Sequence, residues 1–263
     1  MRIAVGLAYD GGGFVGWQHQ IEGRSVQDEV ERALAIVADE PVSVTAAGRT
    51  DAGVHAAAQV VHFDTASSRS VRNWVLGANR HLPADVALRW ACEVPEDFHA
   101  RFSASARRYC YFIRESATRP VLDRSRCAWV HETLDLVAMQ QAAAFLVGEH
   151  DFSAFRAAGC QAHTPQRDLR RLEVRRADGL LRVEAEANAF LQHMVRNIVG
   201  SLVRVGRGKV EPAWMHEVLV SRDRRRAGAA APACGLVLAG IEYPVRFALP
   251  ATFGLEEERP LEL

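Results

Sequence analysis

The sequence predicts an α+β protein made of two related units whose sheets join. Segments that alternate between apolar and polar residues, which is the period of a half-buried strand, are interspersed with segments of helical period. Both halves of the 263-residue chain contain strands and helices in a comparable order, and the length suffices for two domains that each bury a core. We place the first unit at residues 1–103 and the second at residues 104–263, although no sequence repeat proves a duplication.

The first unit opens with an alternating strand over residues 3–9, which ends in a run of glycines. Ser25 and Asp28 resemble a capping box, and apolar residues then recur at helical spacing over residues 26–37 until Pro41 ends the pattern. Further predicted elements are strands over residues 42–46, 59–64 and 86–92 and a short capped helix over residues 70–78.

The second unit begins with a predicted strand over residues 107–113 and a helix over residues 134–147. Asp178 and Gly179 form a turn signal between two alternating segments, so we expect a β-hairpin there. The remaining predicted elements are the hairpin strands over residues 169–174 and 180–185, a long helix over residues 190–205, a shorter helix over residues 212–220 and a last strand over residues 236–243.

The long helix is predicted to have two different faces. At 100° per residue its apolar residues occupy one side, which indicates a core-facing surface. The opposite arc therefore forms a cationic face, for which a solvated outer surface is the simpler explanation. The residues on this arc are His193, Arg196, Asn197, Gly200 and Arg204.

Composition is that of an ordinary globular protein, with 49% apolar and 24% charged residues. A formal net charge of zero argues against binding nucleic acid through overall positive charge. Lys209 is the only lysine, and arginine is a good phosphate ligand because its planar group donates two hydrogen bonds at once. A general use of arginine in place of lysine explains the clusters equally well. The clusters are Arg107 and Arg108; Arg167, Arg170, Arg171, Arg175 and Arg176; and Arg222, Arg224, Arg225 and Arg226.

Several classes of protein are disfavoured. No apolar run is long enough to cross a bilayer and the amino terminus lacks the zones of a signal peptide, so we expect a cytoplasmic protein. The five cysteines are far apart without a Cys-x-x-Cys pair, which suggests neither disulfides nor a thiolate zinc site. The histidines follow no known ligand spacing, so no metal is expected.

The run from Gly11 to Gly16 formally satisfies the G-x-G-x-x-G pattern of dinucleotide-binding folds. That motif works only where its last glycine opens a helix, and no helical period follows Gly16 before Ser25. We therefore interpret the glycines as parts of a tight turn and disfavour a nucleotide-dependent oxidoreductase, which binding of NAD or FAD would revive.

A sharper signal lies at residues 47–56, directly after a predicted strand. Arg49, Thr50 and Asp51 place a guanidinium, a hydroxyl and a carboxylate in three successive positions between Gly48 and Gly53. A loop that holds a reactive group has this composition, whereas a packed core does not. From spacing alone, an Asp51 that caps the next segment or pairs with Arg49 is an equal alternative.

The chain resembles the TruA-type tRNA pseudouridine synthases over almost its whole length. The stretch from Gly48 to Ala56, Gly-Arg-Thr-Asp-Ala-Gly-Val-His-Ala, is similar to their active-site motif. The other matching motifs are Tyr9-Asp10-Gly11 with Phe14, Gly16, Trp17 and Gln18; Asn79 with Leu82-Pro83; Phe98-His99-Ala100-Arg101-Phe102; Ala106-Arg107-Arg108-Tyr109; His150-Asp151-Phe152 with Phe155; Phe190-Leu191 with His193-Met194-Val195-Arg196-Asn197; and Ala231-Pro232 with Gly235-Leu236.

This resemblance implies a fold of two ferredoxin-like units whose antiparallel-rich sheets join around a central cleft. It also implies a homodimer that isomerises uridine to pseudouridine at positions 38, 39 and 40 of the tRNA anticodon stem-loop. The reaction is an isomerisation that follows base flipping, so no cofactor is expected. Departures occur at Gly12 and at Arg80-His81, which affect only local loop structure or RNA contacts.

The resemblance also implies the roles of five residues. Asp51 is the catalytic nucleophile, and Arg49 keeps it ionised or fills the gap left by the flipped uridine. Tyr109 stacks on the uracil and takes part in proton transfer from C5, Arg196 contacts the pocket or a phosphate, and Leu236 forms an apolar wall. A non-catalytic RNA-binding module is the alternative, and it would be unaffected by loss of the Asp51 carboxylate.

Overall fold

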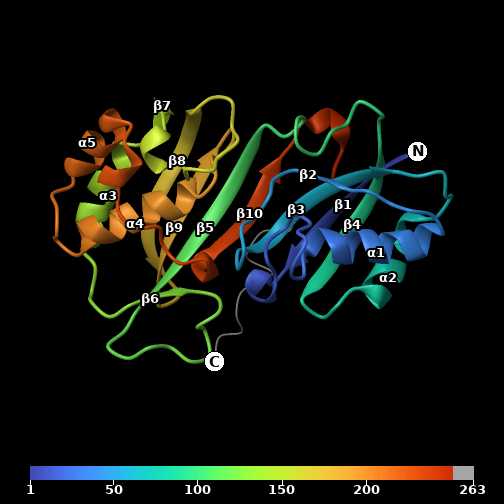
Figure 1. Cartoon of the computed structure of the whole chain (residues 1–263), viewed down its shortest axis with the longest axis horizontal. Helices are drawn as coiled ribbons and strands as arrows, with labels where there is room; N and C mark the ends of the chain where they lie inside the picture. Colours follow the sequence, from blue (N-terminus) through green and yellow to red (C-terminus); the bar gives the residue numbers. More distant parts are fainter. Residues whose placement is uncertain (251–263) are drawn as a thin grey trace. The chain divides into compact units, whose positions relative to one another are not determined.

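The computed structural model describes residues 1–250, and it divides into two compact units (Figure 1). Within the described residues, unit 1 contains Met1–Ser105 together with residues 237–250, and unit 2 contains Ala106–Leu236. The division into folding domains at residues 103 and 104 stays a prediction. The predicted second domain extends to residue 263, and its residues 251–263 lie outside the described part of the chain.

Unit 1 is built on a sheet whose central strands are buried on both faces. β1 pairs antiparallel with both β3 and β4, and β10 pairs parallel with β3. β10, the last strand within residues 1–250, therefore joins the sheet of the first unit. Across the sheet the strands are β4 (Val86–Val94), β1 (Arg2–Tyr9), β3 (His55–Asp64) and β10 (Leu236–Glu242), with the short β2 (Thr45–Ala46) paired to β3.

Two helices, α1 (Val26–Ala38) and α2 (Val71–His81), pack together in unit 1, and α2 also packs on β4 (Figure 1). The Ser25 hydroxyl accepts the Asp28 amide hydrogen at 3.2 Å, which confirms Ser25 as the N-cap of α1, and it also donates to the Asp28 carboxylate at 2.6 Å. α2 runs three residues beyond the predicted end, because Leu82 precedes a proline and is the first residue forced into an extended conformation.

The sheet of unit 2 is mainly antiparallel. Asp178 and Gly179 have φ values of 53° and 69°, which confirms the hairpin turn that this dipeptide predicts. Two further strands of three and four residues escaped prediction because they are too short to show a period. In order the strands are β5 (Ala106–Glu115), β9 (Leu180–Ala187), β8 (Gln166–Ala177) and β7 (Gly148–Asp151), with β6 (Ala128–Val130) parallel to β5.

Unit 2 carries three α-helices, α3 (Leu136–Ala144), α4 (Met194–Gly206) and α5 (Trp214–Ser221), which pack near one another (Figure 1). α4 begins four residues later than predicted because His193 has a φ of 60°, which interrupts the helix. Short 3₁₀ turns of the two units lie at Gly11–Gly13, Ser153–Phe155, Arg224–Arg226, Ala233–Gly235 and Val245–Phe247.

A solvated outer surface, the simpler explanation of the cationic arc on α4, does not hold at the centre of the arc. Asn197 is buried; its amide donates to the Phe155 carbonyl at 2.7 Å and accepts from Arg224 at 2.9 Å. Gly200 packs so closely that a Cβ atom there would lie 1.8 Å from the Ala229 carbonyl oxygen. Residues 227–231 therefore cover this face, which a helical period alone cannot reveal.

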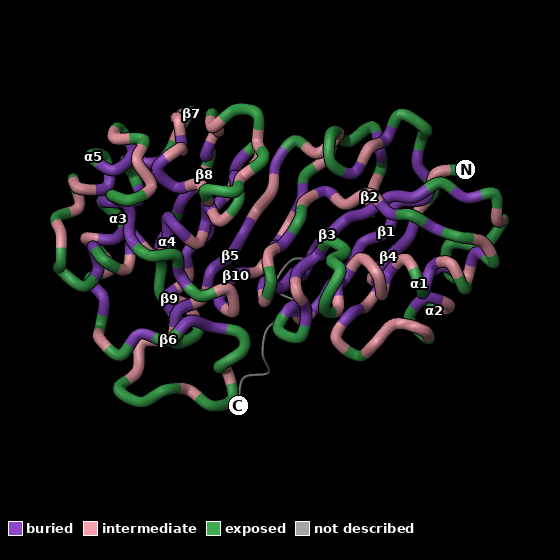
Figure 2. The backbone as a smooth tube through the Cα atoms, in the orientation of Figure 1, coloured by how far each residue is buried: buried purple, intermediate pink, exposed green. Residues whose placement is uncertain are grey.

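Buried residues follow the strands of both units, whereas most of the exposed segments lie in the connections between elements (Figure 2). Within residues 1–250, no helix is both long and apolar enough to cross a membrane. The same residues contain no cluster of three or more His, Cys, Asp or Glu side chains that suits a metal ion.

Candidate active site

Asp51 lies on the loop that connects β2 to β3, at the start of the most buried strand of unit 1. Its backbone forms an isolated antiparallel bridge with Gly16, and its carbonyl accepts the Val54 amide hydrogen at 3.1 Å. Gly53 closes this turn with a φ of 75°, a conformation that favours glycine. The loop is thus held on both sides of Asp51, whose side chain is half-buried.

The glycine run of residues 11–16 packs against this loop. The Trp17 amide donates to the Thr50 carbonyl at 3.0 Å, and a Cβ atom on Gly16 would approach the same oxygen to 2.9 Å. Gly16 also has a φ of 117°, so both its space and its conformation require glycine. α1 begins only at Val26, which confirms that the run does not open a helix as a dinucleotide-binding loop does.

A buried polar network holds the loop from beneath. The hydroxyl groups of Tyr9 and Thr50 are 2.8 Å apart, and the fully buried Gln59 amide donates to the Gly48 carbonyl at 2.7 Å. Burial raises the pKa of Tyr9 to about 12, so its hydroxyl stays protonated at neutral pH. Because Thr50 is anchored inward, its neighbours Arg49 and Asp51 are left more exposed.

Replacing Tyr9 by Phe is expected to loosen this loop without unfolding unit 1. The change removes the partner of the Thr50 hydroxyl and costs about 1 kcal/mol of stability. Hydrogen exchange of the Trp17 amide, which bonds to the Thr50 carbonyl, should therefore become faster.

The matched control is Tyr243→Phe, which removes the hydroxyl that donates to the Ala100 carbonyl at 2.7 Å in the same unit. Equal exchange rates at Trp17 in the two variants would contradict the role given to Tyr9.

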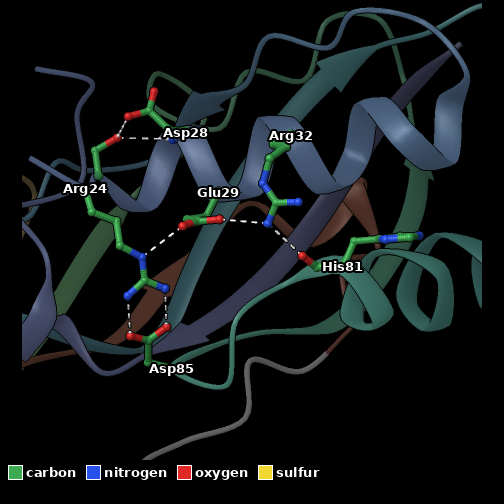
Figure 3. A network of polar contacts seen from close by, with 7 residues as sticks. Arg24, Asp28, Glu29, Arg32, His81 and Asp85 are labelled. Atoms are coloured by element: carbon green, nitrogen blue, oxygen red, sulfur yellow. Dashed lines mark hydrogen bonds and ion pairs between the residues drawn. The ribbon is translucent and has the colours of Figure 1, made fainter. Parts of the chain in front are cut away.

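An ion-pair network centred on Arg24 lies beside the glycine run (Figure 3). The Arg24 guanidinium donates two hydrogen bonds to the Asp85 carboxylate, at 2.8 and 2.9 Å, and one to the Glu29 carboxylate at 2.8 Å. Its guanidinium carbon also lies 4.3 Å from the centre of the Phe14 ring, and the Phe14 carbonyl accepts the Gly53 amide hydrogen at 3.4 Å. The network thus connects α1 and the start of β4 to the loop of Asp51.

Replacing Arg24 by Ala is expected to destabilise the protein by about 1–2 kcal/mol, because Asp85 and Glu29 lose their shared partner. Arg24 holds the pKa of Glu29 below its ordinary value of 4.5, so the stabilisation is present at neutral pH and is lost as the pH falls below that value. Urea unfolding at pH 7 and at pH 3.5 measures both effects.

Arg32→Ala is the control for this network, because Arg32 contacts the other oxygen of Glu29 at 2.8 Å from a more exposed position. We expect a loss within about 0.5 kcal/mol. A larger loss for Arg32→Ala than for Arg24→Ala at pH 7 would contradict the account.

The predicted partner of Asp51 on this loop, Arg49, has an exposed side chain. Within residues 1–250 the structure shows no hydrogen bond or ion pair of the Arg49 guanidinium, so this group is available to a ligand. The alternative in which Asp51 and Arg49 form a purely structural ion pair is therefore not supported.

The other three predicted site residues belong to unit 2. Tyr109 lies on β5 with its ring edge-to-face against Phe190, at 5.1 Å between ring centres. Arg196 lies in the first turn of α4, and its Nε donates to the Ala231 carbonyl at 2.8 Å. Leu236 is buried at the start of β10. Unit 1 thus holds Asp51 and Arg49 on one loop, and unit 2 holds the remaining three.

Sequence reasoning missed the supporting residues Tyr9 and Gln59. Gln59 lies in the middle of β3 between the apolar runs of residues 56–58 and 60–61, and it is fully buried. A polar residue inside such a run is costly unless it is hydrogen-bonded, which is a signal that the sequence does contain.

Comparison with known proteins identifies the family of the chain. A family model described as tRNA pseudouridine synthase matches residues 7–103 and 142–244. The chain is 52% identical over 250 residues to the tRNA pseudouridine synthase A of Vibrio parahaemolyticus, with 95% of each protein covered. It is 53% identical over 250 residues to that of Thiobacillus denitrificans and 54% identical over 252 residues to that of Chromobacterium violaceum, and in both cases 95% of this chain and 96% of the relative are covered. The chain therefore belongs to the tRNA pseudouridine synthase family.

Proposed function

We propose that this chain isomerises uridine to pseudouridine at positions 38, 39 and 40 in the anticodon stem-loop of tRNA. Membership of the family supports the reaction and the tRNA substrate. The observation that carries the proposal is the placement of Asp51, a half-buried carboxylate on a loop whose backbone is fixed by Gly16, Thr50 and Val54. A nucleophile held in this way is preorganised for attack.

The reaction breaks the bond between ribose C1′ and uracil N1, rotates the base and joins C1′ to C5. The hydrogen on C5 leaves as a proton and N1 ends with a proton, so the isomerisation is balanced without a redox partner or a nucleotide. The Asp51 carboxylate serves as the nucleophile, either at C1′ or at the base, and is released at the end. The target uridine must first be flipped out of the stem.

We place the remaining substrate contacts on both units. Arg49 is exposed beside Asp51, where its cation suits a phosphate or the gap left by the flipped base. In unit 2, Tyr109 supplies an aromatic ring and a hydroxyl for the uracil, Arg196 supplies a cation and Leu236 an apolar wall.

We further propose that the enzyme acts as a homodimer in the cytoplasm, where tRNA is available. The net charge is zero, so one chain has no overall positive charge to hold RNA. A two-fold axis doubles each local arginine cluster and so strengthens binding without a change in composition.

The test is incubation of the purified protein with an anticodon stem-loop transcript that carries uridine at positions 38, 39 and 40. We expect pseudouridine at these positions and none elsewhere, as mapped by mass spectrometry of nuclease fragments. A transcript with cytidine at the three positions is the negative control. Tight binding without any product would instead support the non-catalytic RNA-binding module.

A further inference from the structure

A column of four aromatic rings runs from the core of unit 1 to its surface. Phe98 is fully buried at its base, and the His62 ring meets Phe98 edge-on at 5.9 Å between ring centres. The His99 ring follows at 4.9 Å from His62, and the Phe102 ring lies 4.3 Å from His99 at an interplanar angle of 31°. The column ends in the Phe102 side chain, which is 75% exposed.

The turn that carries Phe102 is held by hydrogen bonds. The His99 Nδ1 atom accepts the amide hydrogens of both Arg101 and Phe102 at 3.2 Å. Ser103 closes the turn, since its amide donates to the His99 carbonyl at 2.8 Å and its hydroxyl oxygen accepts the His99 amide hydrogen at 3.0 Å. A single exposed apolar residue is ordinary, but here one face of the ring is fixed against His99 and the rest is open to solvent.

Both histidines of the column are neutral at physiological pH. Burial and the nearby Arg2 guanidinium lower the pKa of His62 to about 4 and hold the pKa of His99 below its ordinary value. A neutral imidazole is also what the contacts require, because Nδ1 of His99 accepts two hydrogen bonds. The support beneath Phe102 is therefore uncharged and stays in place at neutral pH.

A cation adjoins the exposed ring. The guanidinium carbon of Arg101 lies 5.4 Å from the centre of the Phe102 ring. An exposed aromatic face beside an arginine suits a nucleotide, because the base stacks on the ring while the guanidinium meets the phosphate. A protein partner would be expected to cover a wider apolar patch than one ring.

We propose that Phe102 is a stacking platform for an unpaired base of the tRNA substrate, with Arg101 at the adjoining phosphate. The inference rests on the proposed function, because it takes tRNA as the ligand. The stacked base is a different nucleotide from the target uridine. His62, the column residue that belongs to β3, lies seven residues along this strand from His55, the end of the strand next to the Asp51 loop. At 3.3 Å per residue, this separation is about 23 Å. The platform therefore holds a second nucleotide and helps to orient the RNA.

The first test is the affinity of Phe102 variants for the anticodon stem-loop. Loss of one base–aromatic stack corresponds to roughly a 5- to 150-fold increase in Kd for Phe102→Ala. Phe102→Tyr keeps the ring and should bind within about twofold of the wild type, whereas Phe102→Leu keeps apolar volume and should bind as weakly as Phe102→Ala. Leu76→Ala, at an exposed apolar residue on α2, is the matched control for lost surface.

The second test locates the base directly. Stem-loops that carry 2-aminopurine at one unpaired position each should show fluorescence quenching by stacking at one of these positions, with the quenching lost in Phe102→Leu and kept in Phe102→Tyr. Arg101→Gln should reduce the slope of log Kd against log salt concentration by about 0.7–0.9, because one phosphate contact is lost.

Wild-type affinity in both Phe102→Ala and Phe102→Leu would overturn the inference, as would equal quenching in all variants. A change in subunit association of Phe102→Ala, measured by sedimentation with RNA affinity unchanged, would instead make Phe102 a contact to a second copy. The same samples are assayed for product at saturating enzyme. Pseudouridine formed by the wild type keeps the proposed function intact whatever the Phe102 variants show.

Discussion

The Asp51→Asn variant is expected to form pseudouridine at least about 10³-fold more slowly than the wild type while it binds tRNA with nearly unchanged affinity. The amide has the shape of the carboxylate but is no nucleophile. The loop should keep its conformation, because the bridge to Gly16 and the bond to Val54 use the backbone of Asp51. Single-turnover rates and RNA titration separate the two quantities.

The control is Asp64→Asn, which removes a carboxylate at the opposite end of β3. Asp64 accepts two hydrogen bonds from Arg2 at 2.8 and 2.7 Å and is well exposed. Its replacement should therefore lower the free energy of unfolding slightly and leave the rate of pseudouridine formation unchanged. An Asp51→Asn enzyme that retains more than a tenth of the wild-type rate would show that Asp51 is not the nucleophile.

Gly16→Ala should lower the catalytic rate about 10- to 100-fold, because a displacement of the nucleophile by about 1 Å has that effect. The added Cβ would lie 2.9 Å from the Thr50 carbonyl oxygen, and the φ of 117° is strained for any residue with a side chain. We also expect a loss of about 1–3 kcal/mol in stability. Single-turnover kinetics and urea unfolding measure the two effects.

Gly48→Ala is the matched control, since Gly48 lies in the same loop and a Cβ atom there would meet nothing within 4 Å. It should leave the position of Asp51 unchanged. If both alanine variants lose the same activity, close packing of Gly16 on the loop does not position the nucleophile.

Elements with a local chemical signal could be predicted from the sequence. Ser25 and Asp28 cap α1 as expected, and the Asp178-Gly179 turn forms the hairpin between β8 and β9. Pairings between distant segments could not be predicted, because no local pattern encodes them. The sequence groups residues 236–243 with the second half, whereas β10 pairs with β3 in unit 1.

The covered face of α4 illustrates a different limit. Its period separates apolar from polar residues, but it cannot say that residues 227–231 cover the polar side or that Asn197 hydrogen-bonds to Phe155 in the core. Polarity alone therefore does not indicate exposure. A buried amide with two partners has the same sequence signature as a solvated one.

The candidate site was predictable to the level of its loop. Glycines around Arg49, Thr50 and Asp51 mark a constrained polar segment, and the structure places it beside a buried strand. The hydrogen bonds that support this loop come from Tyr9 and Gln59, and their positions depend on how β1 and β3 are paired. Leu7 pairs with Gln59, and the pairing shifts between Leu7 and Tyr9, whose hydroxyl contacts that of Thr50. Register of this kind is set by the whole sheet.

The most direct measurement is the structure of the Asp51→Asn protein bound to an anticodon stem-loop. We predict that a uridine at position 38, 39 or 40 is flipped out of the stem, with its C1′ or uracil ring about 3–3.5 Å from the side chain at position 51. A complex in which all three uridines remain stacked, or in which the flipped base lies beyond reach of that side chain, would contradict it.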